Sequence, residues 1–381
     1  MTFCLSVDAS AYRSHLVSVM NQTAVSGADL VPVIKGNGYG FTSEILFEEA
    51  KKLGVSRIAI GTVWELPQAL AKFSGEIVVL EPFNSADQNA TLQWKSILQH
   101  NADRVIVMLR GNDFVAAAAA GVKLAYAEGV TSLHRFGISA QELTSLKISD
   151  LGGITLRGIS LHLPIADSTK VFDATSEVSN VINAKKLSGK LSEIWNWLKL
   201  FQEFATADHL PLHMSLSHIS NAELTELKSM CQSYGYNFTF DIRIGTSLWL
   251  GNKQALSVKA TILQIHELTD SQRIGYHQVK SGKRQRLLVV SGGTSHGVAL
   301  AAPTSSSSIR KKGIAISEVF NQAIGRVRSP FSHNGEFLNF AEPPHMHVSM
   351  VLSDDAQLQV GDLLDCRVRN SIAAFDQVLG L

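Results

Sequence analysis

The stretch Leu30 to Thr42, LVPVIKGNGYGFT, contains the residue of this sequence that is best suited to covalent chemistry. An apolar, β-branched run ends in Lys35, and three glycines and a tyrosine follow before a helical pattern begins. A lysine at the end of a buried strand is costly to desolvate, and the cost falls if its amine is neutral or bound covalently to an aldehyde. Lys35 is therefore a candidate Schiff-base lysine. The alternative is an ordinary strand-end lysine whose amine reaches solvent.

Further side chains that suit binding and proton transfer follow other apolar runs along the chain. They are Tyr39, Glu128, Arg135, His162, His218, Asn221, Arg243, Gly245 and Thr246. If these runs are the parallel strands of one barrel, their carboxyl ends meet at a single mouth. We therefore expect these groups to converge there with Lys35. For a single histidine such as His162, the alternative is a purely structural role.

Short β-branched or apolar runs must position these side chains. The eight runs are residues 31–34, 57–63, 76–81, 104–109, 123–128, 154–162, 210–217 and 238–244. Segments with helical periodicity lie between most of them, which predicts parallel strands joined by right-handed crossovers. The pattern predicts an α/β protein with a (β/α)8 TIM barrel. A doubly wound open sheet is the rival, but no GxGxxG follows the first strand and no paired halves are visible.

The pattern changes after about Gly251, where strand-like runs are separated by turns instead of helices. This change predicts a C-terminal, mostly antiparallel β domain over residues 251–381. The barrel is expected to span residues 9–250, and the short strand within residues 1–8 is expected to join the β domain. Residues 165–189 are too long for an ordinary connection and are interpreted as an insertion or lid near the active-site face.

Composition argues against several classes of partner. The 381 residues carry a formal net charge of +1 with acids and bases mixed, so nothing predicts binding to nucleic acid or to an anionic membrane. The start of the chain has no basic region followed by an apolar run, and no apolar stretch approaches membrane-spanning length. Cys4, Cys231 and Cys366 lack a metal-like spacing and cannot all pair, which predicts buried thiols and a cytoplasmic protein.

Seven short fragments follow one another along the chain: VIKGNGYG, LHRFGIS, SLH, HISNA, DIRIGTS, IGYHQ and HVSM. Together they resemble the alanine racemase family of fold-type III pyridoxal-phosphate enzymes. The resemblance covers nearly the whole chain, including the order of a barrel and then a β domain. It implies pyridoxal 5'-phosphate as the cofactor, bound through Lys35, and the interconversion of L- and D-alanine that supplies D-amino acids to cell walls.

The resemblance also implies a role for each matching position. Lys35 and Tyr276 would be the two bases that remove and return the α-proton on opposite faces of the substrate. A tyrosine is an unusual base, so cationic neighbours must help it. Arg243, with His162 as its partner, would face the pyridine nitrogen and keep it unprotonated. Arg135 would bind the substrate carboxylate.

The phosphate and a second subunit complete the implied site. The phosphate would be held by a phenol and by backbone amides of residues Tyr39, Asn221, Ala222, Gly245 and Thr246. Tyr276 and Met350 would come from the neighbouring subunit of a head-to-tail homodimer with shared active sites.

Several departures from the family pattern indicate a divergent member. Glu128 stands where the family often has a lysine that can be carbamylated, and it could supply the same negative charge. Ala222 replaces a serine of the phosphate turn, Val351 follows Met350 in place of an aspartate, and the chain ends without the late tyrosine. Alanine is the substrate that the resemblance leads us to expect first, although these departures weaken that expectation. The alternatives are another small amino acid, or a cofactor-binding homologue without racemase activity.

Other classes of protein explain less of the sequence. A small pyridoxal-homeostasis protein has no second β domain and no equivalent of Tyr276. A basic-amino-acid decarboxylase needs a substrate-binding cysteine and acid motif near the second domain, which we do not find; a scaffold that lost its activity remains a rival. Residues 345–347, HMH, place two imidazoles on one predicted strand face, but no third ligand is evident, so no metal is expected. The serine-rich stretch 302–313 is interpreted as an exposed loop.

Overall fold

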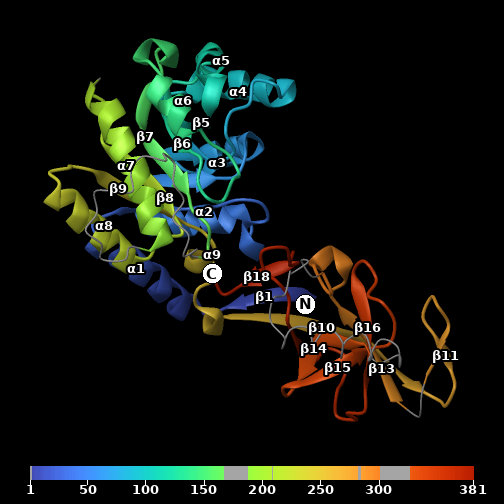
Figure 1. Ribbon diagram of the computed structural model, residues 1–381. Helices are drawn as coiled ribbons and strands as arrows, with labels where there is room; N and C mark the ends of the chain where they lie inside the picture. Colours follow the sequence, from blue (N-terminus) through green and yellow to red (C-terminus); the bar gives the residue numbers. More distant parts are fainter. Residues whose placement is uncertain (1, 167–187, 208, 282–284, 301–326) are drawn as a thin grey trace. The chain divides into compact units, whose positions relative to one another are not determined.

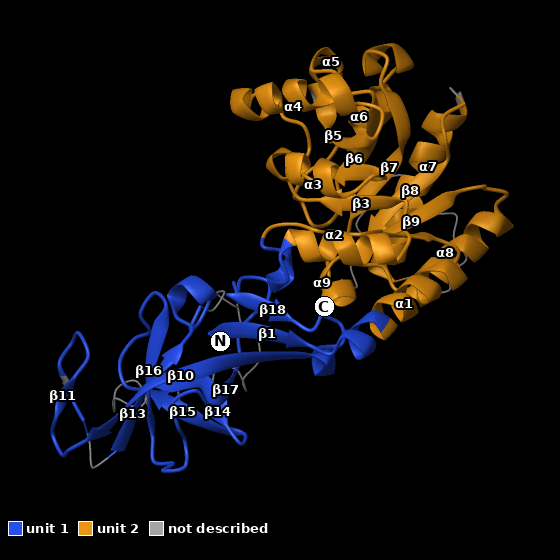
Figure 2. Ribbon diagram, turned by 180° about the vertical axis from the view of Figure 1, so that it is seen from behind, with its two compact units in different colours: residues 1–13, 37–42, 250–381 blue, residues 14–36, 43–249 orange. Residues whose placement is uncertain are grey.

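A computed structural model describes residues 2–166, 188–207, 209–281, 285–300 and 327–381. Most of the predicted insertion at 165–189, and all of the serine-rich stretch at 302–313, lie outside the described residues. The chain forms two compact units (Figure 2). Residues 14–36 and 43–249, orange in Figure 2, form what we call the barrel unit. Residues 1–13, 37–42 and 250–381, blue in Figure 2, form what we call the β unit.

Eight parallel strands form the centre of the barrel unit. They are β2 (Asp29–Pro32), β3 (Arg57–Ile60), β4 (Glu76–Val79), β5 (Val105–Leu109), β6 (Leu124–Gly129), β7 (Thr155–His162), β8 (His213–Ser217) and β9 (Thr239–Ile244). Hydrogen-bonded neighbours follow the order β2-β9-β8-β7-β6-β5-β4-β3. The ring closes where Val33 pairs with Ala59 and the Ile34 N–H donates to the Ala59 carbonyl over 2.7 Å. The predicted barrel is confirmed.

Helices follow the strands and lie on the outer side of the ring (Figure 1). They are α1 (Ala9–Val25), α2 (Ser43–Lys52), α3 (Leu66–Lys72), α4 (Gln88–Asn101), α5 (Phe114–Ala119), α6 (Ala140–Ser145), α7 (Gly189–Ala207), α8 (Asn221–Ser233) and α9 (Thr246–Trp249). Side-chain caps start several of them: the Asp87 carboxylate accepts the Ala90 N–H over 2.9 Å at α4, and Ser220 and Glu223 form a capping box at α8.

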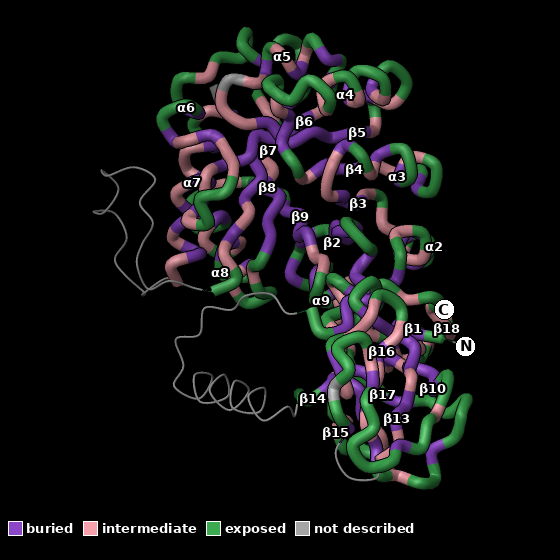
Figure 3. Tube along the Cα trace, turned by 90° about the vertical axis from the view of Figure 1, so that its right-hand side faces the viewer, coloured by how far each residue is buried: buried purple, intermediate pink, exposed green. Residues whose placement is uncertain are grey.

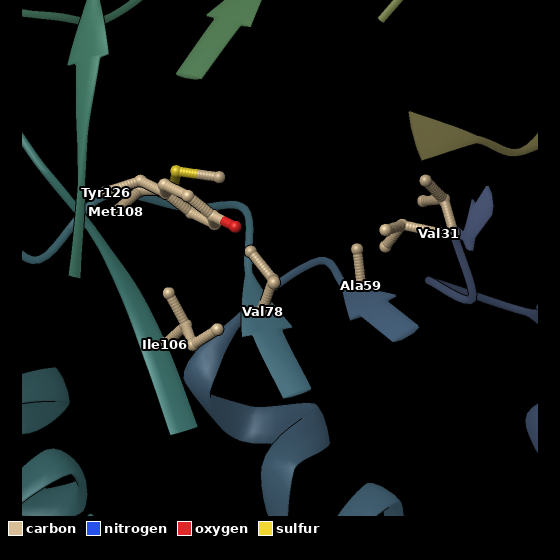
Figure 4. Packing of buried hydrophobic residues seen from close by; sticks show 7 residues of the cluster. Val31, Ala59, Val78, Ile106, Met108 and Tyr126 are labelled. Carbon is tan, nitrogen blue, oxygen red and sulfur yellow. The ribbon is translucent and has the colours of Figure 1, made fainter. Parts of the chain in front are cut away.

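One half of the barrel interior is apolar. Residues within or just after β2 to β6 form a single buried cluster of Val31, Val33, Ala59, Val78, Ile106, Met108 and Tyr126 (Figure 4). They alternate along each strand with residues that face the helices, as the period of two requires. Both sides of the strands are thereby covered, and Figure 3 shows the barrel strands buried over most of their length.

The other half of the interior is polar. Glu128 of β6 is in register with Ser160 of β7. Ser160 is in register with Ser215 of β8, and Ser215 is in register with Asp241 of β9. All of these side chains are buried. Arg243 lies two residues beyond Asp241 on the same face of β9 and pairs with a residue of the apolar cluster, so this polar row also lines the interior.

Asp241 anchors a buried network below Arg243. Its Oδ2 atom lies 2.9 Å from Arg57 Nη1 and 3.1 Å from His213 Nε2, and it accepts the Tyr126 hydroxyl over 3.3 Å. A buried charge is costly unless it is paired and hydrogen-bonded. These contacts therefore fix the amino-terminal ends of the strands and leave Arg243 as the buried cation nearer the mouth.

The β unit is built on one sheet of eight strands. They are β1 (Phe3–Val7), β10 (Leu256–Leu268), β13 (Gln285–Ser291), β14 (Arg328–His333), β15 (Glu336–Phe340), β16 (Val348–Ser353), β17 (Leu363–Cys366) and β18 (Gln377–Leu379); β11 (Arg273–Ile274) and β12 (Val279–Lys280) form a separate hairpin. Neighbours pair antiparallel except β1 with β18, which confirms the predicted mostly antiparallel domain. The amino-terminal β1 pairs with β10, placing Phe3 opposite Ala260.

In the part of the chain that the structure describes, no helix has the length and apolar character needed to cross a membrane.

Candidate active site

Lys35 follows the bridge that closes the barrel, and Glu65 fixes the backbone beside it. The Glu65 carboxylate accepts the Gly36 N–H over 2.7 Å. It also accepts the N–H groups of Gly61 and Thr62, over 2.5 Å and 3.1 Å. A Cβ at Gly61 would lie 2.9 Å from this carboxylate and 3.2 Å from the Lys35 Cβ, so a larger residue there would displace the Glu65 carboxylate. One side chain thus joins the backbone after Lys35 to the turn after β3.

The Lys35 amine is easier to deprotonate than that of an ordinary lysine. Partial burial lowers its pKa, the positive charges of Arg135 and Arg243 lower it further, and the Glu65 carboxylate acts in the opposite direction. These charge effects require the side chains to lie near one another. The structure therefore brings Lys35, Arg135 and Arg243 together at the mouth, as predicted from their strand-end positions.

Arg243 is buried and holds an unused donor. Its Nη2 atom donates to the Leu161 carbonyl over 2.8 Å and lies 3.5 Å from the Ser215 carbonyl. Its Nε atom has no hydrogen-bond partner among the described residues. Burial lowers the pKa of Arg243, and the Glu128 carboxylate opposes this effect. Since an arginine remains protonated in proteins, a buried N–H stays available to an acceptor.

Two histidines stand beside Arg243 at the ends of β7 and β8. His162 Nδ1 lies 2.9 Å from the Ser217 hydroxyl, and its ring meets that of His218 edge-on with centroids 5.2 Å apart. Burial and the Arg243 charge lower the pKa of His162 to about 3. Burial, with the Lys190 charge, also lowers the pKa of His218. Both rings are therefore neutral near pH 7 and add no charge to the mouth.

Arg135 and Glu128 form an ion pair next to these groups. Arg135 Nη2 lies 4.0 Å from Glu128 Oε1, and the Arg135 side chain is 40% exposed. Glu128 is buried, and its Oε2 atom has no hydrogen-bond partner in the described part of the chain. Burial raises the pKa of Glu128, while the charges of Arg243 and Arg135 oppose the rise. The Glu128 carboxylate thus orients the Arg135 guanidinium, which is still accessible to a ligand.

The predicted phosphate residues of the barrel unit lie where two helices begin. Asn221 and Ala222 are the first residues of α8, and Gly245 and Thr246 stand at the start of α9. The first N–H groups of a helix have no partner within the helix and attract anions. Trp249 Nε1 donates to the Val33 carbonyl over 2.7 Å, so α9 is fixed to the strand that leads to Lys35.

Tyr39 is the remaining residue predicted to bind the phosphate, and it belongs to the β unit. It is buried and adopts a left-handed backbone with φ 56°. Gly40 follows with φ 92°, and a Cβ there would lie 2.8 Å from the Phe375 ring. The Asn37 side chain donates to the Ala373 carbonyl over 2.6 Å. The glycine-rich segment after Lys35 is therefore packed against residues near the C-terminus of the chain.

Tyr276, the predicted second base, also belongs to the β unit. Its side chain is 82% exposed, and its ring lies 4.5 Å from that of His345, centroid to centroid. The buried Glu342 carboxylate accepts the Tyr276 N–H over 2.8 Å and lies 2.7 Å from His345 Nε2. His277, Thr294, Pro344 and His347 help these residues to line a cavity of about 590 Å³.

The remaining predicted positions of the β unit lie on β16. Met350 packs against the buried cluster of Leu268, Ile274 and Leu287, and Val351 is fully buried. His345 and His347 precede this strand and have different neighbours, so the interpretation of two imidazoles on one strand face was wrong. Among the described residues, no group of three potential ligands could hold a metal.

The sequence interpretation missed two carboxylates. Residues 62–65 read T-x-x-E, a signal for a helix start, yet the bond from Gly36 to Glu65 spans 29 residues and leaves no local pattern. The bond between Tyr276 and Glu342 spans 66 residues and is equally invisible. His345 was noticed only as a potential metal ligand.

Comparison with known proteins agrees with this geometry. The family model "Alanine racemase, N-terminal domain" matches residues 7–194. A curated alanine racemase of Prochlorococcus marinus is 26% identical over 283 residues, which cover 71% of this chain and 68% of that protein.

Solved structures share the fold. An alanine racemase of Clostridium difficile matches with a TM-score of 0.63 and 15% identity, covering 96% of this chain and 87% of that one. An alanine racemase of Bartonella henselae, solved with covalently bound pyridoxal phosphate, matches with a TM-score of 0.61 and 15% identity, covering 98% and 96%. At these identities, the likeness establishes the architecture of both units.

Proposed function

We propose that this chain interconverts the L and D forms of a small amino acid, with alanine as the first candidate substrate and pyridoxal 5'-phosphate as the cofactor. The chain belongs to the alanine racemase family, whose model matches its residues 7–194. The observation that carries the proposal is the cluster at the barrel mouth. There a lysine with a lowered pKa lies near a buried arginine that has an unused N–H.

The residues at the mouth fit the cofactor. The Lys35 amine would bind its aldehyde, and the unpartnered Nε of Arg243 would donate to an unprotonated ring nitrogen. Backbone N–H groups at Asn221 and Ala222 would hold the phosphate, with Gly245 and Thr246. A β-branched or larger residue at Gly245 would hinder that approach, which is a reason for glycine at this turn.

When bound, pyridoxal phosphate withdraws electrons from the bond to the substrate α-hydrogen and so makes that hydrogen acidic. We infer that Tyr276 and Lys35 stand on opposite faces of the α-carbon. In one direction the phenolate oxygen of Tyr276 takes the proton, and the ammonium group of Lys35 returns another to the opposite face. In the reverse direction the two residues exchange these roles.

Arg243 favours this outcome over other reactions of the same cofactor. Its protonated guanidinium would offer the ring nitrogen a hydrogen bond and keep its own proton, which would limit how much negative charge the cofactor ring takes up. His162 beside it is neutral near pH 7 and adds no positive charge. Return of a proton to the α-carbon is thereby favoured over transamination.

Arg135 would bind the substrate carboxylate through a charge-assisted pair of hydrogen bonds. Glu128, 4.0 Å away, would keep the guanidinium oriented without any modification of the side chain. Because Glu128, Ala222 and Val351 depart from the family pattern, the substrate needs to be tested over a panel of small amino acids.

Assembly, location and domain limits complete the proposal. We expect a homodimer in which Tyr276 and Met350 of one subunit serve the barrel of the other. All three cysteines are buried, which suits a reducing cytoplasm. We keep residues 9–250 and 251–381 as the domain limits, with residues 1–8 assigned to the β domain.

Absorbance and isotope exchange test the function together. The protein mixed with pyridoxal phosphate should show a visible Schiff-base band, and Lys35→Ala should abolish it while Lys123→Ala, an exposed lysine, leaves it unchanged. In D2O, the parent protein should exchange the α-hydrogen of at least one small amino acid and invert its configuration. A Schiff-base band without exchange of the α-hydrogen would show that the protein binds the cofactor but is not a racemase. The absence of a band would refute the whole proposal.

A further inference from the structure

One carboxylate holds both the main chain and the ring environment of Tyr276. Glu342 Oε2 accepts the Tyr276 N–H over 2.8 Å, and Oε1 lies 2.7 Å from His345 Nε2. The His345 ring in turn lies against the Tyr276 ring at 4.5 Å. The Glu342 side chain is 1% exposed, whereas Tyr276 is 82% exposed. A buried carboxylate thus holds an exposed residue through both its main chain and the ring beside it.

Gly275 shows that this contact constrains the neighbouring chain. It has φ 71°, a conformation that side-chain-bearing residues rarely adopt. A Cβ at this position would lie 2.1 Å from Glu342 Oε2. The backbone before Tyr276 therefore lies close to the carboxylate, and a side chain at position 275 would displace it.

An exposed tyrosine ring without such contacts rotates on the picosecond to nanosecond scale. A general base must reach the proton within hydrogen-bond distance, and a displacement of about 1 Å can cost about 100-fold in rate. Within its own chain, Tyr276 is largely exposed. The His345 ring packs against it there and can orient the phenol before substrate binds.

We propose that Glu342 and His345 are a positioning pair that holds Tyr276 ready as a base. The inference rests on the proposed racemase function, because Tyr276 is the group that would meet the substrate. Glu342 fixes the backbone of Tyr276 and the ring of His345, and His345 fixes the plane of the phenol. Neither member of the pair touches the reacting atoms, so both are distinct from the catalytic residues.

Three variants and one control separate positioning from general stability. His345→Ala removes the ring that packs against Tyr276 at a tilt of 40°. His345→Phe restores a flat ring that cannot bond to Glu342, and Glu342→Gln keeps the size of the side chain but removes its charge. His333→Phe is the control, since His333 lies 3.6 Å from Asp355 in the same unit and forms a comparable pair. We expect racemisation to fall about 100-fold in His345→Ala and about 10-fold in the two milder variants. The control should keep the parent rate.

Deuterium exchange supplies a readout that mere destabilisation would not move. In His345→Ala, the amine of Lys35 can still remove the α-proton of one enantiomer and return a solvent deuteron to the same face. That enantiomer should therefore exchange with retention at nearly the parent rate, while inversion falls about 100-fold. The cofactor band should stay at the parent intensity.

Fluorine NMR of protein labelled with 3-fluorotyrosine tests the positioning without any catalysis. The chain has six tyrosines, and Tyr276→Phe identifies the resonance of Tyr276. This resonance should move to the position of a free tyrosine in His345→Ala and stay near its parent position in His333→Phe. An unmoved resonance, or racemisation within about twofold of the parent in both His345 variants, would overturn the inference. If the parent protein racemises nothing, the proposed function fails, and the resonance alone decides whether the pair holds Tyr276.

Discussion

At the scale of single residues, Glu65 controls Lys35 in two ways. Its three backbone hydrogen bonds hold the turn beside the lysine, and its negative charge raises the pKa of the amine against burial and two arginines. Glu65→Gln should therefore lower the pKa of Lys35 further. The fraction of neutral amine rises as the pKa falls, so Lys35 should react with an acylating reagent at lower pH in the variant than in the parent.

Mass spectrometry of acylated peptides across a pH series measures this shift, with Lys123 as an exposed internal reference. Each unit of pKa moves the midpoint of the Lys35 curve by about one pH unit. The curve for Lys123 should be the same in both proteins. A Lys35 midpoint that rises in Glu65→Gln would contradict the electrostatic role.

At the scale of elements, the closing contact of the barrel depends on a small residue. Ala59 of β3 pairs with Val33, packs in the apolar half of the interior and is fully buried. Ala59→Leu overpacks the barrel interior, and it should lower the free energy of unfolding by about 1–3 kcal/mol. Because Val33 lies two residues before Lys35, the variant should also weaken the visible Schiff-base band.

Urea unfolding followed by circular dichroism measures the cost of Ala59→Leu. The matched control is Ala71→Leu, the same change at an exposed position of α3, which should alter stability by less than about 0.5 kcal/mol. Equal losses in the two variants would show that the closure of the barrel does not depend on the size of residue 59.

The elements of the barrel could be read from the sequence because short β-branched runs alternate with helical periods. The position of Lys35 followed, since a strand must end where the glycines begin. The polar row could not be read in this way: Ser160 and Ser215 look like ordinary strand serines, and only the register places them between Glu128 and Asp241. Register depends on the twist and closure of the whole ring, which local patterns do not encode.

At the scale of the whole molecule, the two proposed bases belong to different compact units. Lys35 is in the barrel unit, and Tyr276 is in the β unit, where 82% of its side chain is exposed. If the subunits of a dimer exchange Tyr276, each active site contains Lys35 from one chain and Tyr276 from the other. A chain with Lys35→Ala and a chain with Tyr276→Ala are then both inactive alone, but a mixed dimer contains one intact site.

Mixing the two inactive variants tests this arrangement. After partial unfolding and reassembly at equal amounts, random pairing gives mixed dimers for about half of the population, and about one quarter of all sites should be intact. Racemisation should return to about that fraction of the parent rate, whereas either variant reassembled alone should stay inactive. If both bases came from the same chain, every site in every dimer would lack one of them. The absence of any recovery, with mixed dimers demonstrated by native mass spectrometry, would therefore exclude shared sites and place Lys35 and Tyr276 of one chain in a single site.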